Sequence, residues 1–471
     1  MKKIYYTLIM ACILCSCNDF VDIVPKGNTI PSTVDDLAKM MNNGSMATGG
    51  DAFEIFGITA GTFYLEVYSD DYVLSENPES ALYQAYLANT SIMNTLKWGD
   101  YIYGLAQSDY NWDNMYHSNY IANYVLDNID KVEEGTAYRR DEVKGQALVH
   151  RAMNYFLLVN LYGKQYKAVT AETDLGVPLV LEADINKQYP RATVAEVYTQ
   201  MLGDLDEAIG LLKTEVPKFN NQPGLATAYA LCARYRLWMQ NYDEAYDDAV
   251  SALGMRSEMI DYNHCAFLYP GMPTYGLSGY DMVLLTNPEV MYSRFVSEHC
   301  KCSYSAEMLA LIDKEKDLRY QLFIASMPAY GYLEEVAWNK HLHSGIDVSE
   351  VWLMKAEAAL RKSKPDIQEA LAALNEVRRH RYVAATYQPY AETNPDLLLR
   401  EILNERRREL IYTEMSFLDK KRLNADPKTA APMNRTYLGE TYTMPVDDPH
   451  WQLAIPLNVM ALNPLLEQNQ R

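Results

Sequence analysis

The stretch ATAYALCARYRLWMQNYDEAYDDAVSAL, residues 226–253, decides the fold of this chain. Apolar residues recur at helical spacing on both sides of a polar turn at 240–243, which predicts two helices joined by a tight connection. Ala233 and Ala245 lie twelve residues apart, and Ala249 follows on the second helix. Small side chains at these positions allow two antiparallel helices to approach closely.

A second stretch, EVWLMKAEAALRKSKPDIQEALAALNEV at 350–377, repeats this arrangement. Ala358 and Ala370 are again twelve residues apart, and Leu374 follows at the same offset. Recurrence of the same offsets indicates a structural repeat. The pattern resembles the tetratricopeptide helix hairpin, whose copies stack on one another into a superhelix.

Weaker helical signals surround these two hairpins. Segments 112–163 and 193–240 fit the same plan more loosely, and Thr193 with Glu196 predicts a capping box. Thr33 precedes another helix start, with aspartates in the first turn. We therefore expect a mainly α fold, a tetratricopeptide-like superhelix of about four helix pairs decorated by long irregular segments. Ordinary antiparallel helices are the alternative.

Two segments, 44–110 and 256–349, lack the helical pattern. The second contains FLYPGMPTYGLSGYD, together with histidines, cysteines and several prolines. Long irregular segments on a rigid scaffold usually carry function. We expect the binding site in these two segments.

Composition excludes some partners. The chain of 471 residues has a formal net charge of −20, which would repel a nucleic-acid backbone, so we expect no nucleic-acid partner. Tyrosine is frequent, at 38 residues, and its ring serves both helix packing and ligand platforms. Beyond the N-terminus, no run of 18 or more apolar residues predicts a transmembrane helix.

The N-terminus has the features of an export signal. Lys2 and Lys3 precede an apolar run at 4–14 that is too short to cross a bilayer. The LCSC that follows resembles the bacterial lipoprotein box, which implies cleavage before Cys17 and diacylation of that cysteine. Two acyl chains anchor a protein stably at a membrane. An ordinary secretory signal is the alternative, and a metal site is disfavoured because no further ligand lies nearby.

Several stretches, in their order and spacing, resemble the SusD/RagB outer-membrane lipoproteins of Bacteroidetes. They are CNDFVDIVPKGNTIPSTVDDL from 17, Trp112 and Tyr116, KGQALVHRAMNYFLLVNLYG from 144, GVPLV from 176, RATVAEVYTQMLGDLDEA from 191, ILNERRREL from 402 and AIPLNVMALNPLLEQNQR from 454. One departure stands out. Where the family commonly has Glu-Gly-x-Arg before an aromatic pair, this chain has Thr413, Glu414, Met415 and Ser416. The usual acid and base are both missing, which indicates the loss of a structural ion pair.

The resemblance implies a surface-exposed, outer-membrane lipoprotein that caps a SusC-like TonB-dependent transporter. Such a protein captures an oligosaccharide, or in some members a peptide, and delivers it as a lid closing over the barrel. It implies no catalysis and no cofactor. The expected parts are a signal peptide at 1–16, a lipid-anchored tether at 17–27, an N-terminal part at 28–255 and a C-terminal part at 256–471, the last two forming one compact fold.

Aromatic side chains are the expected ligand contacts, because sugar C–H faces stack on rings. The candidates are Trp98, Tyr101 and Tyr103 in the first irregular segment, and Tyr269, Tyr275, Tyr280, Asp281 and Trp338 in the second. Loop packing or partner contact is the alternative for each. On predicted helices, where core packing is expected, lie Trp112, Trp238, Trp352 and Cys232.

Cysteines and histidines of the second segment raise another question. His264, Cys265, His299, Cys300 and Cys302 are residue types that bind zinc, but their spacing matches no common zinc framework. In an oxidising compartment a disulfide from Cys265 to Cys300 or Cys302 is more plausible than a metal. Free thiols are the third alternative, and we assign no metal site.

Two other functions remain as alternatives. An intracellular tetratricopeptide scaffold would have no use for an export signal. A surface glycoside hydrolase would need two carboxylates held apart across a cleft, for which there is no sequence signal. The arginines 406–408 of NERRREL, at 404–410, are balanced by the flanking Glu405 and Glu409, which predicts a solvated helix face.

Overall fold

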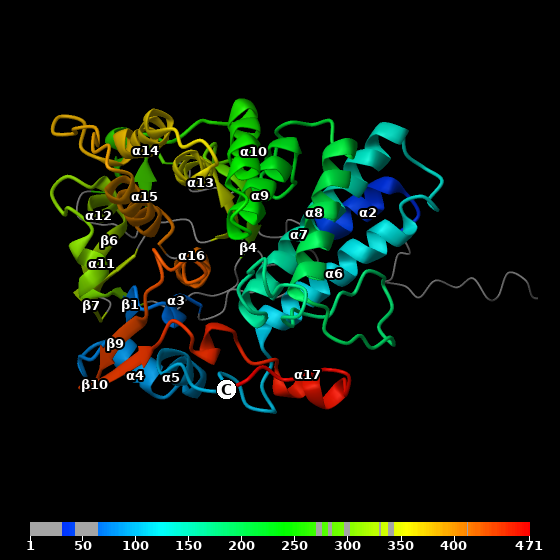
Figure 1. The fold of residues 1–471 in the computed structure, drawn as a ribbon, viewed down its shortest axis with the longest axis horizontal. Helices are drawn as coiled ribbons and strands as arrows, with labels where there is room; N and C mark the ends of the chain where they lie inside the picture. The colour runs from blue at the N-terminus through cyan, green and yellow to red at the C-terminus, as the bar shows by residue number, and fades with distance from the viewer. Residues whose placement is uncertain are drawn as a thin grey trace, which may run out of the picture.

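The computed structural model describes residues 31–42, 65–269, 276–280, 285–295, 302–328, 331–337, 343–411 and 413–471. The export signal and Cys17 lie outside the described residues. Figure 1 shows long helices across the top and right of the molecule, with short helices and strands gathered at the lower left.

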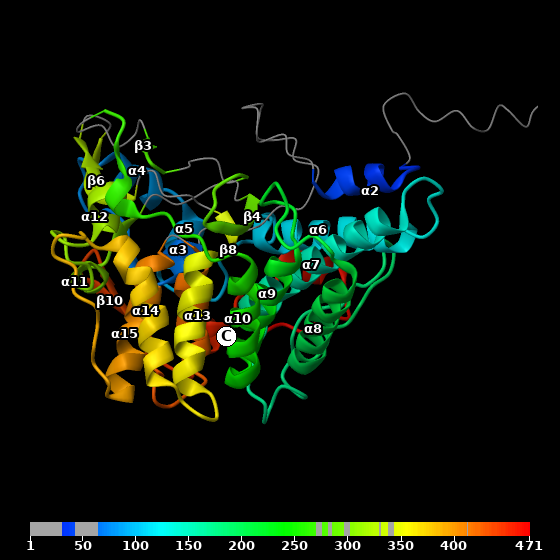
Figure 2. The ribbon, with the colours of Figure 1, turned by 90° about the horizontal axis from the view of Figure 1, so that it is seen from above.

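The long helices form the scaffold. They are α6 (Tyr110–Asn128), α7 (Ala137–Tyr162), α8 (Val194–Leu211), α9 (Leu225–Trp238), α10 (Tyr242–Met255), α13 (Val348–Arg361), α14 (Ile367–Arg381) and α15 (Pro395–Glu409). From α6 to α10 each helix packs against the next, α10 packs against α13, and α13 packs against both α14 and α15. Figure 2 shows α8, α10, α13, α14 and α15 side by side in one row. The predicted mainly α superhelix is confirmed.

The alanine spacing that predicted the first hairpin has the expected cause. Ala233 of α9 and Ala245 and Ala249 of α10 are fully buried. The turn between the helices passes through Gln240, whose φ of 63° lies in the left-handed region that ends many helices. The next N–H, of Asn241, donates to the carbonyl of Arg236 at 2.9 Å and closes the turn.

Helix starts and the core also follow the sequence. The predicted capping box of α8 and the predicted helix start after Thr33 are both confirmed, and Thr33 with Asp36 also forms a capping box at α2 (Val34–Met41). Trp112, Trp238 and Cys232 are buried in the main core as predicted, whereas Trp352 is only half-buried. Within the described residues, no helix combines the length and the apolar character that a membrane span requires.

Shorter elements complete the chain. Those of the first irregular segment are α3 (Leu65–Tyr68), β1 (Tyr72–Val73), α4 (Ala81–Leu87) and α5 (Thr90–Leu96). Those of the second are η2 (Tyr262–His264), β2 (Ala266–Phe267), β3 (Leu277–Ser278), β4 (Val290–Phe295), β5 (Ser303–Tyr304), α11 (Ala306–Ala310), α12 (Leu318–Phe323), β6 (Ile324–Met327), β7 (Tyr332–Ala337) and β8 (His343–Asp347). After α15 follow α16 (Met415–Leu423), β9 (Met433–Tyr437), β10 (Glu440–Met444), η5 (Pro449–Trp451) and α17 (Leu457–Leu462).

The prediction of a solvated face for the arginines of α15 is wrong. Arg406 and Arg408 are 1% and 5% exposed. Arg406 donates to Asp419 of α16 at 3.1 Å, and Arg408 donates to Glu405 at 2.7 Å. A buried charge needs such partners. Asp419 belongs to another helix, so local sequence could not show that this face is covered.

Candidate functional site

The two irregular segments meet in one small sheet. β1 of the first segment pairs antiparallel with β5 of the second, with Tyr72 opposite Tyr304, and the sheet continues to β7 and β6. Next to the sheet, the hydroxyl of Ser80 donates to Glu334 at 2.8 Å, and the N–H of Ala81 donates to the carbonyl of Gly331 at 3.0 Å. Segments more than 200 positions apart in the sequence thus share one layer.

Trp98 is not a ligand platform. Its ring is only 6% exposed, its N–H donates to the carbonyl of Tyr68 at 2.8 Å, and the guanidinium of Arg435 lies 4.6 Å from the ring centre. A sugar could not reach this ring without opening the core. The indole of Trp98 therefore anchors the loop that follows α5.

That loop exposes the next two predicted aromatics. The ring of Tyr101 is 39% exposed, and the side chain of Asn94 holds the loop by donating to the carbonyl of Tyr101 at 3.0 Å. Tyr101, Tyr103 and Arg471 line one narrow cleft. Asp109 also lines it, and burial raises the pKa of this carboxyl to about 6, although hydrogen bonds that include one from Tyr162 oppose the rise.

A larger cavity also has Arg471 in its lining. It has a volume of about 660 Å³. Its lining consists of Lys164, Gln165, Lys167, Thr170, Asp174, Lys421, Asn424, Ala425, Val446, Asp447, Asp448, Pro449, Trp451, Gln452, Gln470 and Arg471. Most of these side chains are hydrogen-bonding groups. Because Arg471 lines both, we call the cleft and the cavity together the Arg471 groove. Figure 1 shows the C-terminus between α5 and α17.

Hydrogen bonds hold the rim of this groove. His450 lies 2.6 Å from Asp448 through Nδ1 and 3.0 Å from Asp100 through Nε2, which joins the C-terminal segment to the loop of Tyr101. The ring of Trp451 stacks on Phe417 of α16 with centroids 5.9 Å apart. The C-terminal segment was not among the predicted site residues. No local motif marks it, because its residues become a wall only when the chain returns to α5 and α7.

The remaining predicted residues belong to the second segment. Tyr269 is 57% exposed beside the β2–β3 hairpin. Tyr280 is half-buried and packs edge-on against Phe323 with centroids 5.3 Å apart. Tyr275, Asp281 and Trp338 lie outside the described residues. Neither Tyr269 nor Tyr280 is among the described residues that line the Arg471 groove.

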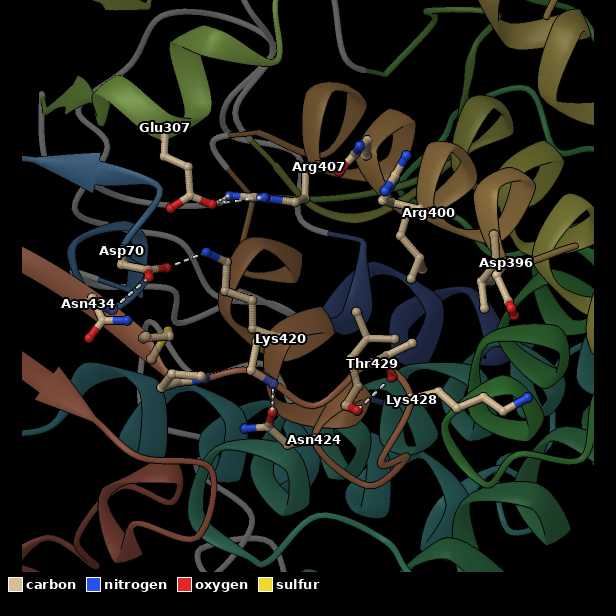
Figure 3. A pocket seen from close by; sticks show the side chains of 17 residues that line it. Asp70, Glu307, Asp396, Arg400, Arg407, Lys420, Asn424, Lys428, Thr429 and Asn434 are labelled. Atoms are coloured by element: carbon tan, nitrogen blue, oxygen red, sulfur yellow. Dashed lines mark hydrogen bonds and ion pairs between the residues drawn. The ribbon is translucent and has the colours of Figure 1, made fainter. Parts of the chain in front are cut away.

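A second cavity, of about 580 Å³, lies between α15, α16 and β9. Figure 3 shows Lys420 pointing toward Asp70 and Arg407 toward Glu307 at one end of it. At the other end lie Asp396 and Lys428. Acids and bases at the first end of this cavity thus satisfy one another.

The same region contains Ser416, one of the positions at which this chain departs from the family motif. The hydroxyl of Ser416 lies 3.4 Å from the buried carboxylate of Asp71. Lys420 and Arg407 bind this carboxylate at 2.9 and 2.5 Å. Burial raises the pKa of Asp71, but the ammonium and the guanidinium outweigh it and hold the pKa below its ordinary value. Lys420 and Arg407 thus supply the positive charges that bind the Asp71 carboxylate beside Ser416.

The cysteines form no metal centre in the residues that the structure describes. Among the described residues the thiols of Cys265 and Cys302 are both free, and that of Cys265 donates to the carbonyl of Gly279 at 3.4 Å, so no disulfide joins these two. Burial raises the pKa of this thiol to about 11, which keeps it protonated. Cys302 is buried near β5, and Cys300 lies outside the described residues.

Two family models match the sequence. Residues 58–237 match a model described as starch-binding associating with outer membrane, and residues 346–470 match a model of the SusD family. No curated protein sequence matches the chain.

The fold is similar to several solved structures. A SusD superfamily protein from Bacteroides thetaiotaomicron is 21% identical, with a TM-score of 0.70 over 93% of this chain and 100% of that one. A SusD superfamily protein from Bacteroides fragilis is 20% identical, with a TM-score of 0.71 over 93% and 100% of the chains. A SusD-like carbohydrate binding protein from Bacteroides vulgatus is 18% identical, with a TM-score of 0.63 over 93% and 98%.

Proposed function

This chain belongs to the SusD/RagB family, and from that premise we propose that it is a cell-surface lipoprotein that captures a nutrient glycan. It passes the glycan to a SusC-like TonB-dependent transporter, over which it acts as a lid. A peptide is the alternative ligand. The protein binds its ligand without transforming it and carries no cofactor.

The Arg471 groove is the observation that carries this proposal. It combines a cleft lined by two tyrosines and Arg471 with a polar cavity of about 660 Å³ that Arg471 also lines. Sugars present C–H faces that stack on aromatic rings and hydroxyls that bond to carboxylates, amides and ammonium groups. A cavity of this size suits a ligand of a few sugar units. Support from a relative comes from the carbohydrate-binding protein of Bacteroides vulgatus, which shares the fold.

Titration calorimetry with malto-, xylo- and galacturono-oligosaccharides tests the proposal. We expect at least one series to bind and the double variant Tyr101→Ala/Tyr103→Ala to weaken that binding about tenfold, because two stacking surfaces are lost. Tyr138→Ala is the matched control, since Tyr138 is 55% exposed on α7, away from the groove. Unchanged binding in the double variant would remove the groove from the proposal.

The anchor and the lack of catalysis are tested separately. Radioactive palmitate should label the parent in a Bacteroidetes host and leave Cys17→Ala unlabelled, whereas an intracellular scaffold would be unlabelled in both. Incubation of the purified protein with any glycan that it binds should release no reducing ends. Release of reducing sugar would instead support a glycoside hydrolase.

A further inference from the structure

Two cationic side chains, Lys421 and Arg471, line the larger cavity of the Arg471 groove without an ion pair to any described residue. Lys421 of α16 is 2% exposed, and both Lys421 and Arg471 line the larger cavity. The Lys421 ammonium forms no ion pair with any described residue. Its hydrogen bonds go to the carbonyls of Asn160 and Gly163, at 2.6 and 2.7 Å, at the C-terminal end of α7.

Arg471 is also incompletely satisfied. Its Nη1 donates to the carbonyl of Gln452 at 2.7 Å. Its Nε and Nη2 are enclosed and have no hydrogen-bond partner among the residues that the structure describes. A guanidinium with two free donors in its fork matches the two oxygens of a carboxylate.

Electrostatics agree with this geometry. Burial, and after it the neighbouring Arg471, lower the pKa of Lys421 from 10.5 to about 7. Burial also lowers the pKa of Arg471, although Asp100 and Asp448 are among the groups that oppose this shift. Two like charges that are poorly solvated and close together favour a negative charge between them. Within a chain of net charge −20, such a pair is unusual.

Acids on the cavity wall do not supply that charge. Asp174 is bound to Lys164 at 2.7 Å, and Asp448 is bound to His450 at 2.6 Å. Asp447 is exposed. None of these acids forms an ion pair with Lys421 or Arg471 among the described residues.

We propose that the Arg471 groove takes a glycan that carries a carboxylate, a uronic acid, with the carboxylate held between Lys421 and Arg471. The proposal rests on the function proposed above and names its substrate class. Tyr101 and Tyr103 hold neighbouring sugars, and the polar cavity binds their hydroxyls.

Calorimetry with trigalacturonic acid and its fully methyl-esterified form tests the charge directly, since esterification removes the charge and keeps the sugar backbone. We expect the acid to bind at least about tenfold more tightly than the ester, as for a charge-assisted pair. Lys421→Met should bring the two affinities within about twofold. Because Lys421 also binds the end of α7, Arg471→Gln is the second variant, and the same loss of preference is expected.

Lys428→Met is the matched control, because Lys428 lines the other cavity and is exposed. It should leave the preference for the acid intact. Equal binding of acid and ester by the parent, or a preference that survives in both groove variants, would overturn the proposal. The proposal would also be overturned if trigalacturonic acid failed to bind while inorganic sulfate bound in a way that depends on Lys421 and Arg471.

The outcomes separate this inference from the proposed function. If a neutral oligosaccharide binds through Tyr101 and Tyr103 and the acid does not, the uronic-acid inference fails and glycan capture stands. If no oligosaccharide of any series binds, glycan capture fails with it.

Discussion

Lys420 of α16 donates to the carboxylate of Asp71 at 2.9 Å, although 349 residues separate the two in the chain. Asp71 belongs to the first irregular segment and α16 to the C-terminal part of the chain. The contact therefore ties the layer of irregular segments to the helices behind it. It also places a cation beside Ser416, where the family commonly carries arginine.

Lys420→Met should lower the free energy of unfolding by about 2–4 kcal/mol, because it leaves a buried carboxylate with only Arg407 as its cation. Urea denaturation measures the loss. Ser416→Arg, added to Lys420→Met, should recover most of it by supplying a cation from one turn earlier. Lys428→Met on the same cavity should change stability by less than about 0.5 kcal/mol. Equal effects of the two lysine variants would contradict this account of Asp71.

Gly145 sets the distance between α7 and α8. A Cβ at this position would lie 2.8 Å from Cγ of Leu212. Gly145→Ala should therefore destabilise the protein by about 1–3 kcal/mol through overpacking. At Gly203, on the exposed face of α8, a Cβ would meet nothing within 4 Å. Gly203→Ala should stabilise by about 0.5–1 kcal/mol, because alanine loses less backbone entropy in a helix. The melting temperature should fall for Gly145→Ala and rise for Gly203→Ala. Shifts of the same sign would refute the packing argument.

Arg234 and Glu350 join α9 to α13 through a buried ion pair. Arg234 Nε lies 3.0 Å from Glu350, and the two side chains are 0% and 2% exposed. Arg234→Met alone should cost about 3–5 kcal/mol, since it leaves the Glu350 charge buried with only the more distant Arg406. The double variant Arg234→Met/Glu350→Leu should be clearly more stable than the single one. A double variant as unstable as the sum of its parts would show that the pair does not act as a unit.

Lys421 makes stability depend on pH. Its pKa is about 7 in the folded protein against 10.5 ordinarily, so between these values the unfolded chain binds a proton that the folded one does not. Stability therefore rises with pH across this window, by up to about 1.4 kcal/mol per pH unit. Lys421→Met removes this pH-dependent contribution to the free energy of unfolding. The variant should therefore lose more stability relative to the parent at pH 9.5 than at pH 6.5. Urea denaturation of parent and variant at both values gives the difference, and a pH-independent difference would mean that Lys421 titrates normally.

Local pattern was sufficient for the scaffold. The twelve-residue alanine spacing predicted hairpins whose alanines are fully buried, and Thr193 with Glu196 predicted the start of α8. These features depend on residues close together in the chain, whose spacing on a helix is set by the geometry of the backbone.

Predictions that depended on distant contacts fared differently. Trp98 was expected on the surface because it lies in an irregular segment, but the carbonyl of Tyr68 and the guanidinium of Arg435 enclose it. Arg406 was expected in solvent because glutamates flank it, but Asp419 of another helix binds it. In both cases exposure depends on what packs over the residue, and the covering residues lie elsewhere in the sequence.

The sequence by itself determined that this chain is a helical superhelix with two irregular segments, and it predicts a lipid anchor at its start. Only the tertiary structure decided that the two segments share a sheet and that Lys421 and Arg471 meet in one cavity. The physical reason is the separation along the chain of the residues that interact. Helix formation and capping depend on side chains a few residues apart, whereas a groove forms where segments hundreds of residues apart are brought together by packing.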